Sequence, residues 1–217
     1  MKSFFFRFIN MIFGLFLYAL GIVVTIKANI GYAPWDVFHY GLANTFNISF
    51  GSCSIIVGTI IMAVLLLLKE KIGLGTIFNI ILIGLFLDII LFIDLIPVPQ
   101  NFAARIIMLL AGLFIIALGS YFYIKTAFGT GPRDSLMVVL AKKTKIPIGI
   151  CRSAVELTAT LAGWFLGGMV GVGTVISVIG IGFCIQIVFR IFSFDATIIE
   201  HESLYDTFKI LKKMKAA

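Results

Sequence analysis

Two short segments combine glycine, proline and aspartate at the same spacing in an otherwise strongly apolar chain. Residues 30–38 read IGYAPWDVF, and residues 128–136 read FGTGPRDSL. Proline is favoured at the first position of a helix, and an aspartate two residues later lies in the first turn, where free N–H groups favour negative charge. A helix start is the simpler interpretation, and binding of a cation or proton by the carboxylate is the functional one. The candidate pathway residues here are Gly31, Pro34, Asp36, Gly129, Pro132, Arg133 and Asp134.

The two segments differ at the position between proline and aspartate, which is Trp35 in the first and Arg133 in the second. Tryptophan is enriched at membrane interfaces, and arginine is enriched in cytoplasmic loops. We therefore expect Trp35 to be an interface anchor and Arg133 to be a topological charge, with a role in a solute site as the alternative for each.

Four further polar residues lie inside apolar runs. Arg152 and Glu156 stand four residues apart, hence on one face of a helix, and they can neutralise each other or handle protons or anions. Asp88 and Gln186 can hydrogen-bond between helices, which is the simpler interpretation, or line a path. Charged groups are costly inside a membrane, so all four are candidates for a substrate or ion pathway.

Patterns for catalysis, metal binding and cofactors are absent from the sequence. His39 and His201 are isolated, and the His-Glu pair at 201–202 lacks the second histidine of a zinc protease motif. The Gly-x-Gly-Thr segments at 73–76 and 171–174 lack the lysine of a phosphate-binding loop, and we expect tight turns there with Thr76 and Thr174 as helix caps. The cysteines, Cys53, Cys151 and Cys184, have no metal-type spacing. We expect no enzyme activity, metal or cofactor.

The composition places these residues in a membrane protein. Of 217 residues, 61% are hydrophobic and only 12% are charged, far from the balance of a soluble domain. The net charge of +7 does not indicate nucleic-acid binding, because the basic residues are scattered between apolar segments. The lipid bilayer is therefore the expected partner, together with an unknown small molecule or ion.

Apolar runs give the elements that position the candidate residues. They cover approximately 8–28, 51–68, 74–93, 103–126, 149–167 and 172–193, and each has about the length needed to cross a bilayer as a helix. The runs 34–46 and 132–144 are too short and too polar to cross alone. We expect an all-α membrane protein with six transmembrane helices and two short helices that are re-entrant or interfacial.

The second half of the chain repeats the first without a gap when the sequence is shifted by 98 residues. Residues 11–93 align with 109–191, and Gly14, Gly21 and Lys27 fall on Gly112, Gly119 and Lys125. Each copy holds three spans, and an odd number forces the second copy to enter the membrane from the opposite side. The sequence therefore predicts two inverted repeats in a single membrane domain, 1–217, joined by a linker at 94–101.

The basic residues indicate the orientation. With the N-terminus in the cytoplasm, 15 of the 17 lysines and arginines lie on the cytoplasmic side, as the positive-inside rule requires. The C-terminus is then cytoplasmic too, and the tail at 200–217 has an apolar helical stripe beside lysines. We expect this tail to form a short helix lying on the membrane, or else a solvated basic tail.

These motifs resemble the YczE/YyaS/YitT family of bacterial integral membrane proteins, and its YczE-like branch most of all. The resemblance rests on the G-x-x-P-W-D and G-x-G-P-R-D segments, the R-x-x-x-E at 152–156 and the second Gly-x-Gly-Thr. It covers almost the whole chain, with Ala33 where the second copy has Gly131 as a mild departure. It implies a six-span protein of the bacterial inner membrane but no substrate or reaction.

We expect a secondary transporter or permease for a small solute, since inverted repeats with broken helices suit alternating access. The alternative is a binding or accessory subunit for an ATP-driven importer or for a membrane-linked biosynthetic pathway. A homodimer that encloses a path is compatible with either function.

Overall fold

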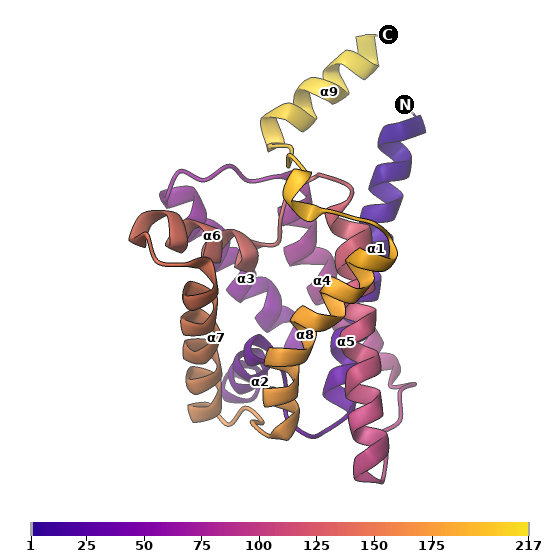
Figure 1. The fold of residues 1–217 in the computed structure, drawn as a ribbon, viewed down its shortest axis with the longest axis vertical. Helices are drawn as coiled ribbons and strands as arrows, with labels where there is room; N and C mark the ends of the chain where they lie inside the picture. The colour runs from indigo at the N-terminus through magenta and orange to yellow at the C-terminus, as the bar shows by residue number, and fades with distance from the viewer. Residues whose placement is uncertain (1, 217) are drawn as a thin grey trace.

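The structure, a computed structural model, describes residues 2–216, and within that range it consists of helices and loops without a strand (Figure 1). The α-helices are α1 (Lys2–Lys27), α2 (Pro34–Phe46), α3 (Phe50–Leu67), α4 (Leu74–Ile93), α5 (Phe102–Ile124), α6 (Pro132–Thr144), α7 (Ile148–Phe165), α8 (Val172–Ile191) and α9 (Leu204–Ala216). The all-α class is therefore confirmed. The predicted linker at 94–101 is non-helical.

Five helices of the described range are long and apolar enough to cross a membrane: α1, α3, α4, α5 and α8. The predicted span at 149–167 is helical as α7 but is not one of these five. Its sequence is more polar, with Arg152, Glu156, Thr158 and Thr160 in 18 residues. The short helices α2 and α6 are also outside this set.

Helices α1 and α5 pack against each other in antiparallel orientation. A Cβ atom added at Gly14 would lie 2.6 Å from the backbone nitrogen of Tyr123, and one added at Gly21 would lie 2.8 Å from the carbonyl oxygen of Gly112. Small residues let two helix backbones approach this closely in a membrane. The contact forms the centre of the largest apolar core, which includes Leu15, Ala19, Leu113 and Ala117.

Helices α2 and α6 begin at the two motif prolines, as predicted. Pro34 and Pro132 occupy the first helical turns, and Asp36 and Asp134 are the acidic residues of those turns. In Figure 1, α2 lies in the lower half of the molecule and α6 in the upper half. Each short helix packs on a long one from the other half of the chain, α2 on α7 and α6 on α3.

The Gly-x-Gly-Thr segments dock onto the loops that precede the short helices of the opposite repeat. The Gly75 N–H donates to the Phe128 carbonyl at 2.7 Å, and the Gly173 N–H donates to the Ile30 carbonyl at 2.7 Å. Gly31 and Gly129 have φ of +113° and +132°, values that favour glycine. Both repeats therefore use the same interlocked loops.

The predicted caps in these segments differ in outcome. Thr174 accepts a hydrogen bond from the Gly171 N–H at the start of α8, as expected for a cap. Thr76 was wrongly expected to cap α4, because its hydroxyl donates to the Thr130 carbonyl of the opposite repeat at 2.7 Å instead. The reason is that the loop before α6 packs on this segment and brings the Thr130 carbonyl within reach of the Thr76 hydroxyl.

In the hairpin α3–α4 the two helices pack together at the end away from their connecting loop. In the equivalent hairpin α7–α8 they are separated there. A Cβ added at Gly51 of α3 would overlap the carbonyl oxygen of Gly84 in α4. The equivalent positions in the second repeat are Gly149 and Gly182, and a Cβ added at either meets no described atom within 4 Å. One sequence repeat thus has two packing arrangements.

Asp88 of α4 holds the closed hairpin together. Its carboxylate accepts from the Ser49 hydroxyl at 2.6 Å and from the Gly51 N–H at 2.7 Å. The interpretation of Asp88 as an interhelical hydrogen-bonding group is confirmed. Its equivalent, Gln186, is exposed on α8, where the splayed hairpin leaves no facing helix.

The two ends of the chain lie at the same end of the molecule (Figure 1). Arg7 of α1 donates to the Thr126 carbonyl and to the Glu202 carboxylate, both at 2.6 Å. The predicted helix in the tail is confirmed as α9, which extends beyond the bundle in Figure 1. Residue 217 of the predicted tail lies outside the described residues.

Candidate functional site

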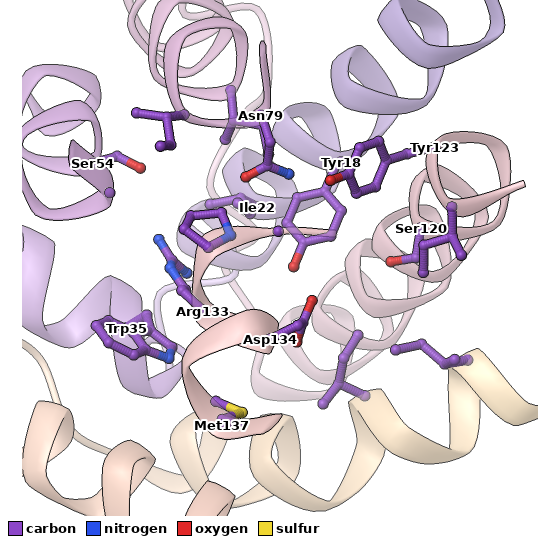
Figure 2. Close-up of a pocket in the computed structure, with 18 of the residues that line it drawn as sticks. Tyr18, Ile22, Trp35, Ser54, Asn79, Ser120, Tyr123, Arg133, Asp134 and Met137 are labelled. Atoms are coloured by element: carbon purple, nitrogen blue, oxygen red, sulfur yellow. The ribbon is translucent and has the colours of Figure 1, made fainter. Parts of the chain in front are cut away.

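A cavity of about 250 Å³ lies between the two halves of the chain, where helices α1 to α8 all contribute lining residues (Figure 2). A smaller cavity of about 90 Å³ adjoins it and shares Tyr18, Trp35 and Arg133 in its wall. The first turn of α6 lines the larger cavity, and the first turn of α2 lines the smaller one. The paired motifs therefore meet at one polar site.

Arg133 connects the two motifs across this site. Its guanidinium carbon lies 4.9 Å from the centroid of the Trp35 ring, and one guanidinium nitrogen lies 3.3 Å from Nε2 of His39. A guanidinium can only donate, so Nε2 of His39 accepts and the imidazole proton is on Nδ1. Burial and the nearby arginine lower the pKa of His39 well below 6.5, which keeps the ring neutral.

The structure places Trp35 and Arg133 where their alternative role, in a solute site, requires them to be. Trp35 lines both cavities and contacts a cation. Arg133 is half-buried between helices and lines both cavities too. The sequence shows these two residues at equivalent repeat positions, but it does not show that the positions contact each other.

Asp36 is buried in the wall of the smaller cavity. Asp36 is 4% exposed. Its Oδ1 lies 4.0 Å from Nδ1 of His39, which is too far for a hydrogen bond. No hydrogen bond to the Asp36 carboxylate is formed within residues 2–216. Burial raises the pKa of Asp36 to about 6, and the positive charge of Arg133 opposes that shift.

Asp134, the repeat equivalent of Asp36, has a different environment. It is exposed to the larger cavity, and Figure 2 shows its side chain directed inward on the side of Tyr18. The two aspartates therefore have the same place in the sequence repeat but differ in exposure. Desolvation nevertheless raises the pKa of Asp134 as well, and the positive charges of Arg152 and Arg133 oppose that shift.

Arg152 and Glu156 form the ion pair that their spacing predicts. Nε of Arg152 lies 2.9 Å from Oε1 of Glu156, and both residues line the two cavities. The Arg152 side chain is 45% exposed and the Glu156 side chain 14%. This pair adds one balanced set of charges to the wall of the site.

The structure does not bring every candidate into the site. Pro34 and Pro132 line the cavities, but Gly31 and Gly129 belong to the interlocked loops, and Asp88 and Gln186 line neither cavity. Asp88 and Gln186 were candidates because a charged group or an amide is unusual in a membrane span. Asp88 forms hydrogen bonds between two helices, whereas the Gln186 side chain has no described contact.

Two polar residues of the site, Tyr18 and Tyr123, were not predicted. They line the larger cavity together with Asn79, and Ser177 lines the smaller one. The Tyr123 hydroxyl, the Ser177 hydroxyl and the Trp35 Nε1–H are buried without a hydrogen-bond partner among the described residues. Polar atoms of this kind are available to a bound solute. A tyrosine in the middle of a span was the signal that could have indicated them.

The lining groups suit a small polar or ionised solute. Two guanidinium groups, two carboxylates and several hydroxyls surround the larger cavity, so hydrogen bonds and charge can both contribute to binding. No group of three or more potential metal ligands occurs among the described residues.

Comparisons with known proteins place the chain among bacterial membrane proteins. It is 35% identical over 175 residues to the "Uncharacterized membrane protein YczE" of Bacillus subtilis (strain 168), covering 80% of each chain. It is also 35% identical over 176 residues to an "Uncharacterized protein" of Haemophilus influenzae (strain ATCC 51907 / DSM 11121 / KW20 / Rd), covering 81% of this chain and 80% of that one.

A more distant relative is the "Uncharacterized protein YyaS" of Bacillus subtilis (strain 168), 27% identical over 170 residues, with 76% of this chain and 83% of that one covered. No solved structure matches the chain. The resemblance predicted from the motifs is confirmed, and residues 5–190 match the "Family of unknown function (DUF6198)". The chain belongs to this family of membrane proteins.

Proposed function

We propose that the protein is a secondary transporter or permease that moves a small solute across the bacterial inner membrane by alternating access. In such carriers, two inverted repeats enclose a central site, and the ends of broken helices face the solute. The polar cavity at the first turns of α2 and α6 supports this function.

The contacts between α1 and α5 support an inverted repeat. Gly14 packs on Gly119, and Gly21 packs on Gly112. The 98-residue shift converts Gly14 into Gly112 and Gly21 into Gly119, so it exchanges one contact for the other. An antiparallel pair related in this way has a two-fold axis across the helices. Helix α7 would then be the sixth span, with its charged pair facing the cavity.

The different packing of the two hairpins is the observation that carries the proposal. Gly51 and Gly84 close α3 against α4, whereas the equivalent Gly149 and Gly182 face no described atom within 4 Å. Equivalent sequences in two arrangements predict a second conformation, in which α7 closes on α8 and α3 separates from α4.

The exposure of the two aspartates agrees with this conformational exchange. Asp36 is buried and Asp134 is exposed to the cavity. With a cytoplasmic N-terminus, the closed hairpin end faces outside and the splayed end faces the cytoplasm. The described arrangement is then the inward-facing state, and closing α7–α8 produces the outward-facing one.

Cysteine cross-linking in membrane vesicles tests the second conformation without knowledge of the solute. Cys53, Cys151 and Cys184 are first replaced by alanine, and Pro147→Cys is then combined with Gln186→Cys. These are the repeat equivalents of Ser49 and Asp88, whose side chains are 2.6 Å apart in the closed hairpin. We expect an intramolecular cross-link, because these positions approach each other when α7 closes on α8. Phe13→Cys with Phe122→Cys is the positive control, since these rings of α1 and α5 are 5.2 Å apart.

Failure of the pair at positions 147 and 186 to cross-link, when the control pair does so, would contradict alternating access. A cross-link that doubles the mass would instead show that these surfaces form a contact between two copies. Transport itself is measured as uptake of a solute panel into proteoliposomes, with protein-free liposomes as the reference. Co-purification with an ATPase and no uptake would favour the accessory-subunit alternative.

A further inference from the structure

Asp36 is the carboxylate of the site that combines burial with the lack of a hydrogen bond among the described residues. Glu156 has an ion pair at 2.9 Å, and Asp134 is open to the cavity. Asp36 is 4% exposed, touches the smaller cavity and accepts no hydrogen bond within the part of the chain that the structure describes. An ionised carboxylate in this environment is costly, and binding a proton relieves that cost.

The groups around Asp36 favour a proton over a metal cation. His39 of the same helix presents Nδ1–H toward the carboxylate, and Arg133 of α6 provides a fixed positive charge. Tyr18 of α1 and Tyr32 before α2 are the neighbouring phenols. A metal ion would need several oxygen ligands and would be repelled by the guanidinium. A proton needs neither a ligand shell nor additional space.

The two arginines of the site have partners of their own. Arg133 lies on Trp35 and donates to His39, and Arg152 pairs with Glu156. Helix α7 contacts α2 through its backbone at Gly163, and α8 adds Ser177 to the smaller cavity. No guanidinium is therefore left to form a close ion pair with Asp36.

We propose that Asp36 binds the proton that couples solute movement to the proton gradient, an inference that rests on the proposed transport function. In the described arrangement the carboxylate is buried and holds the proton. When the two hairpins exchange their packing, Asp36 takes the exposed environment that Asp134 now has and loses the proton to the water on that side. Asp36 thus binds a proton more tightly in one conformation than in the other, which couples proton binding to the conformational exchange.

The fluorescence of Trp35 provides a direct measurement, because its ring lines the same small cavity and contacts Arg133. The chain has two tryptophans, and Trp164→Phe leaves Trp35 as the only one. We titrate this variant in detergent from about pH 4 to about pH 8 and record its emission. A transition with a midpoint near pH 6, the pKa of Asp36, is expected, and Asp36→Asn is expected to abolish it.

Two matched variants identify the titrating group. Asp134→Asn changes the equivalent carboxylate, and His39→Gln removes the imidazole, so both are expected to keep the transition. Size-exclusion chromatography establishes that each variant is folded. A transition that survives in Asp36→Asn, or one that is lost in Asp134→Asn or His39→Gln, would overturn the assignment, as would its absence from the parent protein.

This titration is independent of transport. If the cross-link between positions 147 and 186 forms and solute moves but the fluorescence does not titrate, the transport function stands and the proton site is rejected. If the fluorescence titrates as expected but the cross-link never forms, alternating access is rejected, and Asp36 is a proton-binding group in a protein that does not transport.

Discussion

The guanidinium of Arg133 lies over the indole ring of Trp35, with 4.9 Å between the guanidinium carbon and the ring centroid. These residues occupy the same position in the two sequence repeats, so the contact joins the repeats at their centre. The difference in residue type is thereby explained, since two tryptophans or two arginines could not form a cation–π pair.

The Arg133–Trp35 contact is expected to stabilise the fold by about 1 kcal/mol, the usual magnitude for a cation over an aromatic ring. A double-mutant cycle with Trp35→Leu, Arg133→Gln and the combined variant measures this coupling as the free energy of unfolding in mixed micelles. Additive effects of the two substitutions would show that the contact has no energetic role.

The glycine pairs predict opposite effects of one substitution in the two hairpins. Gly84→Leu should destabilise the protein, because a Cβ there lies 2.7 Å from the Gly51 carbonyl oxygen. Gly182→Leu should leave thermal stability nearly unchanged, since the added atoms meet open space in the described arrangement. It should nevertheless abolish solute uptake by preventing closure of α7 on α8. Normal uptake by Gly182→Leu would contradict the proposed movement.

Asp88→Ala is expected to cost about 1–3 kcal/mol, because it leaves the Gly51 N–H and the Ser49 hydroxyl without their acceptor. The same substitution should make residues at the α3–α4 contact more accessible to a thiol reagent in single-cysteine variants. Gln186→Ala is the matched control and should change stability by less than about 0.5 kcal/mol. Equal effects of the two variants would remove Asp88 from the closure of this hairpin.

The buried carboxylate of Asp36 predicts a pH dependence of stability with a definite sign. Its pKa rises from 3.8 in the unfolded chain to about 6 in the folded protein, so the folded state binds the proton more tightly. The contribution of the carboxyl group is fully present below pH 3.8 and is lost as the pH rises through 6. The loss amounts to about 3 kcal/mol, since one pKa unit corresponds to about 1.4 kcal/mol.

Asp36→Asn mimics the protonated side chain and should not show this loss. The difference in unfolding temperature, wild type minus Asp36→Asn, should therefore fall between about pH 4 and pH 7. A constant difference across that range would show that Asp36 has the same pKa in the folded and unfolded chains. Asp134→Asn, examined in parallel, reports the contribution of the exposed carboxylate.

Local sequence patterns predicted the helix starts well. Pro34 and Pro132 fix the backbone for a first turn and an aspartate suits the free N–H groups there, so these features do not depend on distant contacts. Thr76 shows the limit of such reasoning. Its hydroxyl could cap its own helix or donate to the Thr130 carbonyl of the opposite repeat, and in the structure it donates to Thr130. The site tyrosines were missed because position in a span does not reveal which face meets a cavity.

The sequence by itself determined the membrane class, the two short helices and the equivalence of residues 98 positions apart, because composition, apolar runs and repeated motifs are local properties. Only the tertiary structure decided that Arg133 meets Trp35, that Asp36 is buried while Asp134 is exposed, and that α3–α4 is closed while α7–α8 is splayed. These features depend on how distant helices pack. Two segments with one motif can therefore have different environments, since their packing partners, and not the motif, determine access to water.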